Sequence, residues 1–169
     1  MTDALTLRLA TPADLSAVDA LLAHSYPRLL AADYPPSVLV TALPIIARAR
    51  PELLASGSYW LAQDAAGAIV GAGGWTGAPP VAGDQTLHTG HVRHLVTAAG
   101  RVRQGIGRAL MRCVMAQAAE AGMARLDCLS TRTAVPFYTA LGFRDLGPVD
   151  VTLRPGIVFP AVRMMATLG

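Results

Sequence analysis

The sequence predicts an α/β (α+β) domain in which a central sheet of about seven strands is flanked by about four helices. Strand-like and helix-like periodicities alternate along the chain in the order β-α-α-β-β-β-α-β-α-β-β. In addition, one central helix begins at a glycine-rich turn of the kind that binds anions. With 169 residues, the chain is expected to form a single domain over residues 1–169.

The N-terminal segment predicts a strand followed by a helix. Residues 5–9 alternate between apolar and polar side chains, as a half-buried strand does. Thr11 is a suitable N-cap, Pro12 fits the first helical position, and Asp14 supplies the acidic residue of a helix start. A helix is therefore expected to begin at this point.

Prolines are expected to limit the first two helices. The first helix should run to about His24, and Pro27 should end it, because proline has no backbone N–H. A second helix is expected over residues 37–48, with Pro44 kinking or splitting it.

Turn residues separate the remaining strands. The first two of these form a hairpin around residues 64–67, and the last two form a hairpin with Pro155 and Gly156 at the centre of a type II turn. Residues 77–83 are rich in Pro and Gly and should form a loop. The strands are expected over residues 59–63, 69–75, 87–97, 126–129, 143–153 and 157–166.

One strand carries an irregular pattern. Val92 and Leu95 fall on opposite faces of a regularly alternating strand. A bulge between them would bring both side chains to one face. The alternative is a sheet covered by helices on both faces, which needs no alternation.

The most informative segment covers residues 101–112. Gly105 and Gly107 open an amphipathic helix that is expected over residues 105–121. A helix start presents unpaired backbone N–H groups and the positive end of the helix dipole, and glycine allows a bulky anion to approach them. The segment therefore predicts a cradle for a diphosphate; the alternative is an ordinary glycine-rich helix start. Four arginines surround the two glycines: Arg101, Arg103, Arg108 and Arg112.

Two common phosphate loops are excluded at residue level. Gly100 and Gly105 have the spacing of a Walker A loop, but Ile106 and Gly107 follow where Lys and Ser or Thr belong, and the chain has no lysine. Leu110 occupies the third glycine position of a dinucleotide-binding fingerprint. A nucleotide-binding module is therefore the weakest of the functions considered.

A second motif, Phe-Tyr-Thr-Ala-Leu-Gly-Phe, occupies residues 137–143. With Gly105 and Gly107, it resembles the GNAT superfamily of N-acetyltransferases, in which a glycine-rich helix start is followed downstream by such a motif. Val102 stands where the family has Arg or Gln, and Arg101 lies one residue early. This change removes one side-chain contact but leaves a cradle made of backbone N–H groups. The resemblance covers nearly the whole chain and implies the family's mixed, splayed sheet.

The resemblance implies an acetyl-CoA-dependent N-acetyltransferase that moves an acetyl group to a primary amine of a small molecule or peptide, by direct attack on the thioester. The pantetheine arm would lie between the strands over residues 92–97 and 126–129, with the Leu95 N–H facing the thioester oxygen. The expected contacts with acetyl-CoA are Leu95, Val96, Thr97, Val102, Arg103, Gln104, Gly105, Ile106, Gly107, Arg108, Thr133 and Phe137.

Tyr138 stands at the family's general-acid position. A neutral tyrosine with a pKa near ~10 can protonate the departing thiolate; the alternative is a packing role beside two phenylalanines. His91, four residues before Leu95 on the same strand, is the first candidate for the general base, and His94 is the second. A water chain, or no base at all, is the remaining alternative.

Tyr26, Asp33 and Tyr34 are expected in the linker between the first two helices, which in this family borders the acceptor pocket. A solvated polar loop is the alternative. The sequence leaves open which amine accepts the acetyl group and whether another acyl-CoA is preferred. A non-catalytic acyl-CoA-binding or regulatory domain is the alternative function.

Composition limits the partners. The net charge is +3, but the arginines do not form one basic stripe, so no nucleic acid is expected. Arg and Pro interrupt the apolar runs and no signal peptide is evident, so a cytoplasmic protein without a membrane partner is expected. A homodimer is compatible with the sequence. Cys113 and Cys128 lack metal-site spacing, so no metal is expected.

Overall fold

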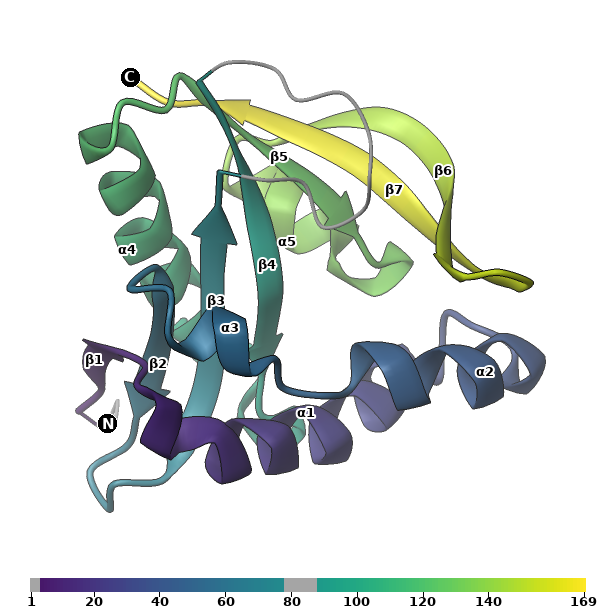
Figure 1. The fold of residues 1–169 in the computed structure, drawn as a ribbon, viewed down its shortest axis with the longest axis horizontal. Helices are drawn as coiled ribbons and strands as arrows, with labels where there is room; N and C mark the ends of the chain where they lie inside the picture. The colour runs from purple at the N-terminus through teal and green to yellow at the C-terminus, as the bar shows by residue number, and fades with distance from the viewer. Residues whose placement is uncertain (1–3, 78–87) are drawn as a thin grey trace.

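The computed structural model describes residues 4–77 and 88–169 and contains one mixed sheet (Figure 1). The sheet has seven strands in the order β1-β2-β3-β4-β5-β7-β6. All neighbouring pairs are antiparallel except β4 and β5, which are parallel. The strands are β1 (Thr6–Leu9), β2 (Tyr59–Gln63), β3 (Ile69–Thr76), β4 (Thr89–Thr97), β5 (Arg125–Ser130), β6 (Arg144–Arg154) and β7 (Ile157–Thr167). The predicted mixed sheet is confirmed.

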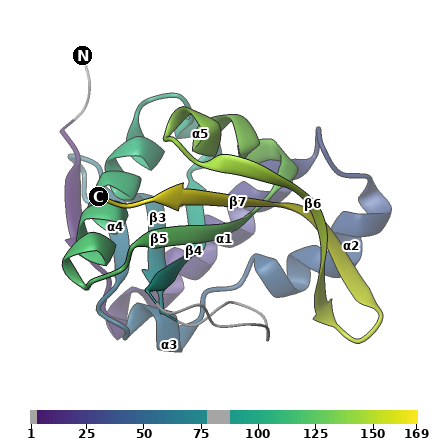
Figure 2. The same ribbon diagram turned by 90° about the horizontal axis from the view of Figure 1, so that it is seen from above.

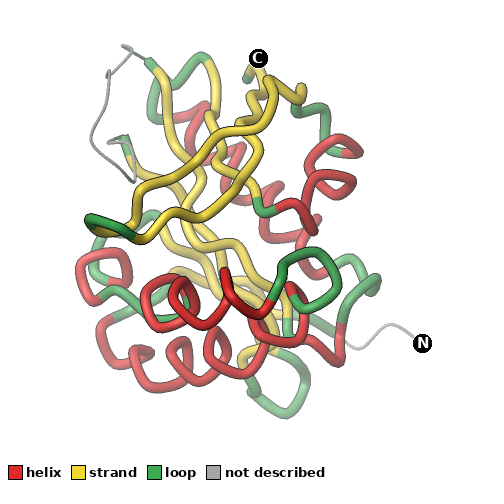
Figure 3. The backbone as a smooth tube through the Cα atoms, turned by 90° about the vertical axis from the view of Figure 1, so that its right-hand side faces the viewer, coloured by secondary structure: helices red, strands yellow, loops and turns green. Residues whose placement is uncertain are grey.

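Helices pack on both faces of the sheet (Figures 2 and 3). One face is covered by α1 (Leu15–Leu30), α2 (Pro36–Ile46) and α3 (Pro51–Leu54), and the other by α4 (Ile106–Glu120) and α5 (Val135–Ala140). The short α3 was not predicted from the sequence. Turns of 3-10 helix precede α1, α4 and α5, at Pro12–Asp14, Ala99–Arg101 and Arg132–Ala134.

The prediction that Pro27 ends the first helix is wrong. The helix α1 continues through Pro27 to Leu30. Proline removes one backbone hydrogen bond of the helix, whereas Leu22 and Leu30 bury apolar surface on either side of it. One consequence is that Tyr26 lies inside α1 and not in a linker.

The second helix, α2, likewise contains Pro44 in its interior and ends at Ile46. The predicted helix start before α1 is present as a 3-10 turn, in which the Asp14 carboxylate accepts a hydrogen bond of 2.8 Å from the Thr11 backbone N–H.

Both predicted hairpins are present. Strands β2 and β3 pair around the turn after Gln63, and β6 and β7 pair around Gly156, whose φ of 83° suits the third position of a type II turn. Most of the loop predicted over residues 77–83 lies outside the described residues, as does Leu87, the predicted first residue of the following strand.

Strand β4 contains a bulge. Gly73 of β3 faces two residues of β4, His94 and Leu95, because the pairing register shifts there. His94 adopts a φ of 47°, in the left-handed region. The bulge predicted between Val92 and Leu95 is therefore confirmed. Helices also cover both faces of the sheet. The bulge and the helices on both faces, which were considered as alternatives for this strand, are therefore both present.

Strands β4 and β5 separate after a short parallel stretch. They pair only from Thr89 to His91, with Arg125 to Asp127 as the partners. Beyond these residues the strands diverge (Figure 1), and within the described residues the facing edges have no strand partner. The predicted splay is confirmed, and it opens the sheet beside the bulge.

One side chain fixes α4 on the sheet. Gln117 Oε1 accepts hydrogen bonds from the indole N–H groups of Trp60 and Trp75, at 3.1 and 2.9 Å, and Gln117 Nε2 donates to the Gly57 carbonyl at 2.9 Å. These bonds anchor the C-terminal end of α4 on β2 and β3.

Candidate functional site

A cavity of about 660 Å³ lies between β4, the N-terminal end of α4 and the segment that follows β5. The structure brings to it all the predicted acetyl-CoA contacts except Gln104, whose Oε1 accepts a hydrogen bond from Arg101 Nε at 2.8 Å. Whether they contact acetyl-CoA stays a prediction. The lining residues are Tyr26, Leu29, Leu30, Leu95, Val96, Thr97, Val102, Arg103, Gly105, Ile106, Gly107, Arg108, Thr131, Thr133, Ala134, Pro136 and Phe137.

The turn before α4 exposes backbone N–H groups to this cavity. Arg103 and Gly105 adopt left-handed conformations, with φ of 62° and 81°, and the chain turns sharply into the helix. Within the described residues, the backbone N–H groups of residues 105–108 donate no hydrogen bond, whereas the next one, that of Ala109, donates to the Gly105 carbonyl at 3.0 Å. These free donors are the groups that an anion would occupy.

Space for a side chain at position 107 is tight. A Cβ atom on Gly107 would lie 3.0 Å from Phe137 Cε2 and 3.1 Å from Phe137 Cζ. The Phe137 ring of α5 therefore packs directly on the backbone of α4. Gly107 and Phe137 both line the cavity.

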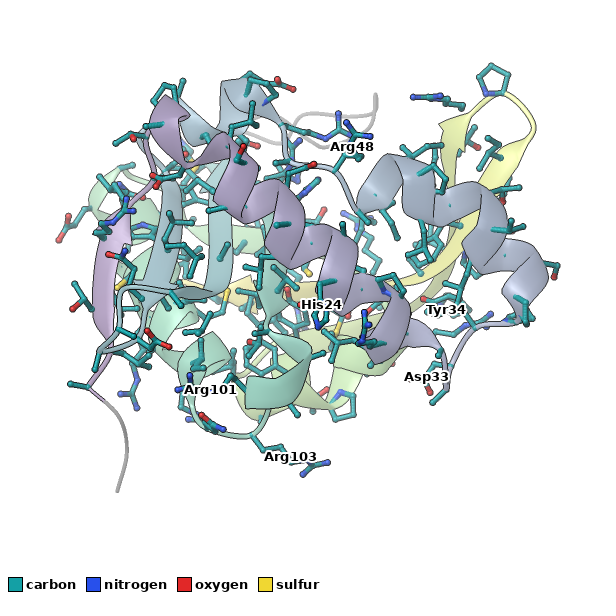
Figure 4. All side chains as sticks on the ribbon, turned by 90° about the horizontal axis from the view of Figure 1, so that it is seen from below. His24, Asp33, Tyr34, Arg48, Arg101 and Arg103 are labelled. Atoms are coloured by element: carbon teal, nitrogen blue, oxygen red, sulfur yellow. The ribbon has the colours of Figure 1, made fainter. Side chains whose placement is uncertain are left out.

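Two arginines beside the turn carry uncompensated charge. Arg103 and Arg108 line the cavity and form no ion pair within the described part of the chain. Figure 4 shows Arg103 projecting away from the body of the domain. Arg101, in contrast, contacts Asp64, with 3.4 Å between Nη1 and Oδ2. The positive charge thus adds to the helix dipole at the mouth of the cavity.

Tyrosine hydroxyls hold the two bulge carbonyls. Tyr26 donates to the Leu95 carbonyl at 3.4 Å, and Tyr59 donates to the His94 carbonyl at 3.0 Å. Burial raises the pKa of the Tyr26 hydroxyl, and the nearby Cys128 adds to this effect. Of the three predicted acceptor contacts, Tyr26 is the one that lines the cavity.

Tyr138 lies in the core beside the splay and does not line the cavity. It is 5% exposed, and its ring packs edge-on against Phe137 and Phe143, both with centroids at 5.1 Å. Burial first, and then the nearby Cys128, raises the pKa of Tyr138 well above its ordinary value. Burial also raises the pKa of Cys128 to about 12. Tyr138 is therefore protonated at neutral pH, and its acid role stays a prediction.

The two histidines lie beside the cavity without lining it. His91 is buried, and its Nδ1 is 4.0 Å from Asp127 Oδ2; burial lowers the pKa of His91 and Asp127 partly opposes this effect. His94 Nε2 is 3.4 Å from Arg50 Nε. Burial, followed by the charges of Arg50 and Arg93, lowers the pKa of His94 to about 4. His94 is therefore neutral at pH 7, and its role as a base stays a prediction, like that of His91.

Tyr34 and Asp33 form contacts within the fold. The Tyr34 hydroxyl donates to the Pro160 carbonyl at 2.7 Å and accepts from the Arg132 N–H at 2.8 Å. Asp33 Oδ2 accepts from Thr133 Oγ1 at 2.6 Å. Figure 4 shows both residues near the end of α1. These bonds tie the α1–α2 connection to β7 and to the start of α5, and contact with an acceptor stays a prediction.

Sequence reasoning missed the pair formed by Arg50 and Arg93. Arg50 immediately precedes α3 and Arg93 precedes the bulge, and their charges act on each other. No motif or spacing connects positions 50 and 93, so only the folded structure brings them together.

Within residues 4–77 and 88–169, no group of three or more His, Cys, Asp or Glu side chains is placed to hold a metal ion. Cys113 and Cys128 are free thiols. No helix among the described residues is long and apolar enough to cross a membrane.

The chain matches a known protein family. A family model described as an acetyltransferase (GNAT) domain matches residues 31–166. None of the curated proteins compared with the chain matches it.

Solved structures match over nearly the whole chain. A structure titled GCN5-related N-acetyltransferase: aminotransferase, class II, from Rhodopseudomonas palustris has a TM-score of 0.72 and 19% identity, and the match covers 99% of this chain and 97% of that one. The PaiA N-acetyltransferase of Thermoplasma acidophilum, in complex with coenzyme A, has a TM-score of 0.70 and 14% identity, with 97% and 99% covered. A GCN5-related N-acetyltransferase from Kribbella flavida has a TM-score of 0.65 and 22% identity, with 98% of each chain covered. At these identities the matches show a shared fold.

Proposed function

The chain belongs to the GNAT acetyltransferase family, and we propose that it transfers the acetyl group of acetyl-CoA to a primary amine of a small molecule or peptide. The family establishes an N-acetyltransferase with acetyl-CoA as the acyl donor. We further propose that it acts as one cytoplasmic domain without a nucleic-acid or membrane partner. The observation that carries the proposal is the single cavity that joins the start of α4 to the open edge of β4.

The start of α4 fits the diphosphate of coenzyme A. The positive end of the helix dipole and backbone N–H groups without a partner among the described residues face the cavity. Arg103 and Arg108, which form no ion pair in the described part of the chain, lie at its mouth. No side chain at Gly105 or Gly107 blocks the backbone. Charge-assisted hydrogen bonds to a phosphate are stronger than neutral ones, so this end would supply much of the affinity.

The open edge of β4 fits the pantetheine arm. Because β4 and β5 stop pairing after His91, the edge of β4 from Leu95 to Thr97 has no strand partner in the described chain. An extended ligand with amide groups can pair with such an edge as an added strand does. The arm would then lead from the α4 turn to the bulge.

Acetyl-CoA supplies an activated acetyl group in a thioester, and the remaining tasks fall to the protein. We propose that the Leu95 backbone N–H at the bulge stabilises the oxygen that becomes negative. We also propose that Tyr138 protonates the departing sulfur. The raised pKa of Tyr138 keeps the proton on the hydroxyl at neutral pH.

The attacking amine must lose a proton, because a lysine-like amine has a pKa near ~10.4. Of the two histidines, His91 is better suited to accept it. Burial, Arg93 and Arg163 oppose protonation of His91, but Asp127 beside it partly offsets them, whereas every cause that acts on the pKa of His94 (burial, Arg50 and Arg93) opposes its protonation. His91 therefore remains the first candidate for the base.

A panel of amines tests the proposal. Polyamines, aminoglycosides, amino acids, peptides and lysine-containing proteins are each incubated with acetyl-CoA, and release of free thiol is measured. At least one class should be acetylated, and EDTA should leave the rate unchanged, since no metal is expected. If coenzyme A binds but every class fails, the chain is a non-catalytic acyl-CoA-binding domain.

A further inference from the structure

Two arginines lie together on the α3 side of β4, beside the bulge. Arg50 Nε is 3.4 Å from His94 Nε2, and Arg93 Nη1 is 3.3 Å from Thr76 Oγ1. The helix α3 packs on this part of the sheet, since its Leu53 and Leu54 share a core cluster with residues of β3 and β4.

The protein compensates the charges of this pair only in part. Among the described residues, neither Arg50 nor Arg93 forms an ion pair with a carboxylate. The nearest acidic influence on Arg93 is Glu52, whose side chain is exposed, while Asp127 is bound by Arg163 at 3.1 Å. Burial, and then the charge of Arg50, lowers the pKa of Arg93, so the arrangement is costly.

A donor of Arg93 also lacks a partner. The Nε atom of Arg93 is buried and has no hydrogen-bond partner among the described residues. Buried donors are almost always paired, because leaving one unpaired costs free energy. An unpaired guanidinium donor beside a second guanidinium group is the arrangement that an incoming anion would complete.

The pair is close to the proposed reaction site. Arg93 and His94 immediately precede Leu95, which lines the cavity and whose N–H we assign to the thioester oxygen. An acceptor that approaches from the α3 side would bring its amine to the bulge and a neighbouring group to the arginines. The cavity side of β4 would remain for acetyl-CoA.

We propose that Arg50 and Arg93 bind a carboxylate of the acceptor, so that the substrate is an amine that also carries a carboxylate, such as an amino acid. This inference rests on the proposed function. Two arginines and one glutamate leave one net positive charge, which matches one carboxylate better than a phosphate dianion. His94, which contacts Arg50, is neutral at pH 7 and adds no charge.

Matched acceptors test the inference. Common L-amino acids are compared with their amides, and phosphoethanolamine with ethanolamine, through kcat/KM for thiol release. The variants are Arg93→Gln, Arg50→Gln and Arg93→Lys. The matched control is Arg144→Gln, which removes the same charge from an exposed position on β6.

The wild type should prefer an amino acid over its amide. Arg93→Gln should lower kcat/KM for the amino acid by roughly 10- to 100-fold and much less for the amide, because it removes charged hydrogen bonds to the carboxylate. Arg93→Lys should restore part of the preference, and Arg144→Gln should retain all of it. Melting temperatures with and without acetyl-CoA verify that each variant is folded.

Three results would overturn the inference: no preference in the wild type, an equal loss for amino acid and amide in Arg93→Gln, or a preference for the phosphate-bearing amine. If no amine is acetylated, the proposed function fails, and calorimetric titration of the amino acids in the presence of coenzyme A decides the inference separately. Binding that Arg93→Gln abolishes would support it, and absence of binding would overturn it.

Discussion

The start of α4 and the bulge of β4 both present positively charged groups to a proposed ligand, but they are built differently. At α4 the donors are consecutive backbone N–H groups, made accessible by Gly105 and Gly107. At the bulge they are the side chains of Arg50 and Arg93, which come from separate segments and share a half-buried position. Backbone donors suit a diphosphate that is common to every acyl-CoA, whereas side chains can be changed to suit one acceptor.

Tyr138 lies in the core beside the splay of β4 and β5. Its replacement should have the largest effect on catalysis. Tyr138→Phe keeps the packing against the two phenylalanines and removes only the hydroxyl. If the hydroxyl protonates the sulfur, kcat and kcat/KM should fall together by roughly 10²- to 10⁴-fold, while affinity for acetyl-CoA changes little. Steady-state kinetics and a binding titration measure the two quantities. Near wild-type kcat in this variant would make Tyr138 a packing residue.

Gly107→Glu should have the next largest effect, and only on the acetyl-CoA region. The side chain would bring a negative charge into the cradle, and its Cβ would press on the Phe137 ring. Affinity for acetyl-CoA should fall roughly 100-fold or more, since like charges in a binding site cost several kcal/mol. The measurement is the acetyl-CoA-dependent rise in melting temperature, which should disappear.

Gly100→Glu is the matched control for that variant, because a Cβ at Gly100 would meet no atom within 4 Å. Gly107→Ala adds the methyl group without the charge and should weaken binding less than Gly107→Glu. If the glutamate variant is folded and keeps the full rise in melting temperature, the ligand lies elsewhere.

A third prediction concerns the support of the α4 region. Gln117→Leu leaves the indole N–H groups of Trp60 and Trp75 without their acceptor. Each such loss costs about 1–3 kcal/mol, so the free energy of unfolding should fall by roughly 2–4 kcal/mol. Urea unfolding measures this change. Gln104→Leu, on the exposed turn, should change it by less than about 0.5 kcal/mol; equal effects of the two would contradict the anchoring role of Gln117.

The smallest effect is a change in the pH dependence of stability at the bulge. The pKa of His94 is lowered to about 4 in the folded chain, against about 6.5 for an unperturbed histidine. Between these values the unfolded chain binds the proton and the folded chain does not, so His94 makes stability fall as the pH falls from about 6.5 to 4. His94→Asn, which tolerates the left-handed backbone, should reduce this slope. Parallel stability curves for the variant and the wild type would contradict the assigned pKa.

The same division explains what the sequence could predict. The α4 turn is encoded by neighbouring residues, and the F-Y-x-x-L-G-F motif and the broken alternation between Val92 and Leu95 are also local, so the fold, the bulge and the cavity lining could be predicted. The prediction that Pro27 ends the first helix was wrong, because burial of apolar side chains of α1 offsets the hydrogen bond that proline removes. The Tyr34 contacts and the arginine pair depend on residues far apart in the chain, and no local pattern records them.

The central claim is that acetyl-CoA spans the cavity from the start of α4 to the open edge of β4. Amide hydrogen exchange with and without acetyl-CoA tests it most directly, since it reports on backbone N–H groups. Protection should appear in residues 95–97 and 105–108, whereas the β6–β7 tip around Gly156 should be unchanged. Protection confined to other segments, or to the α4 turn without β4, would contradict the account.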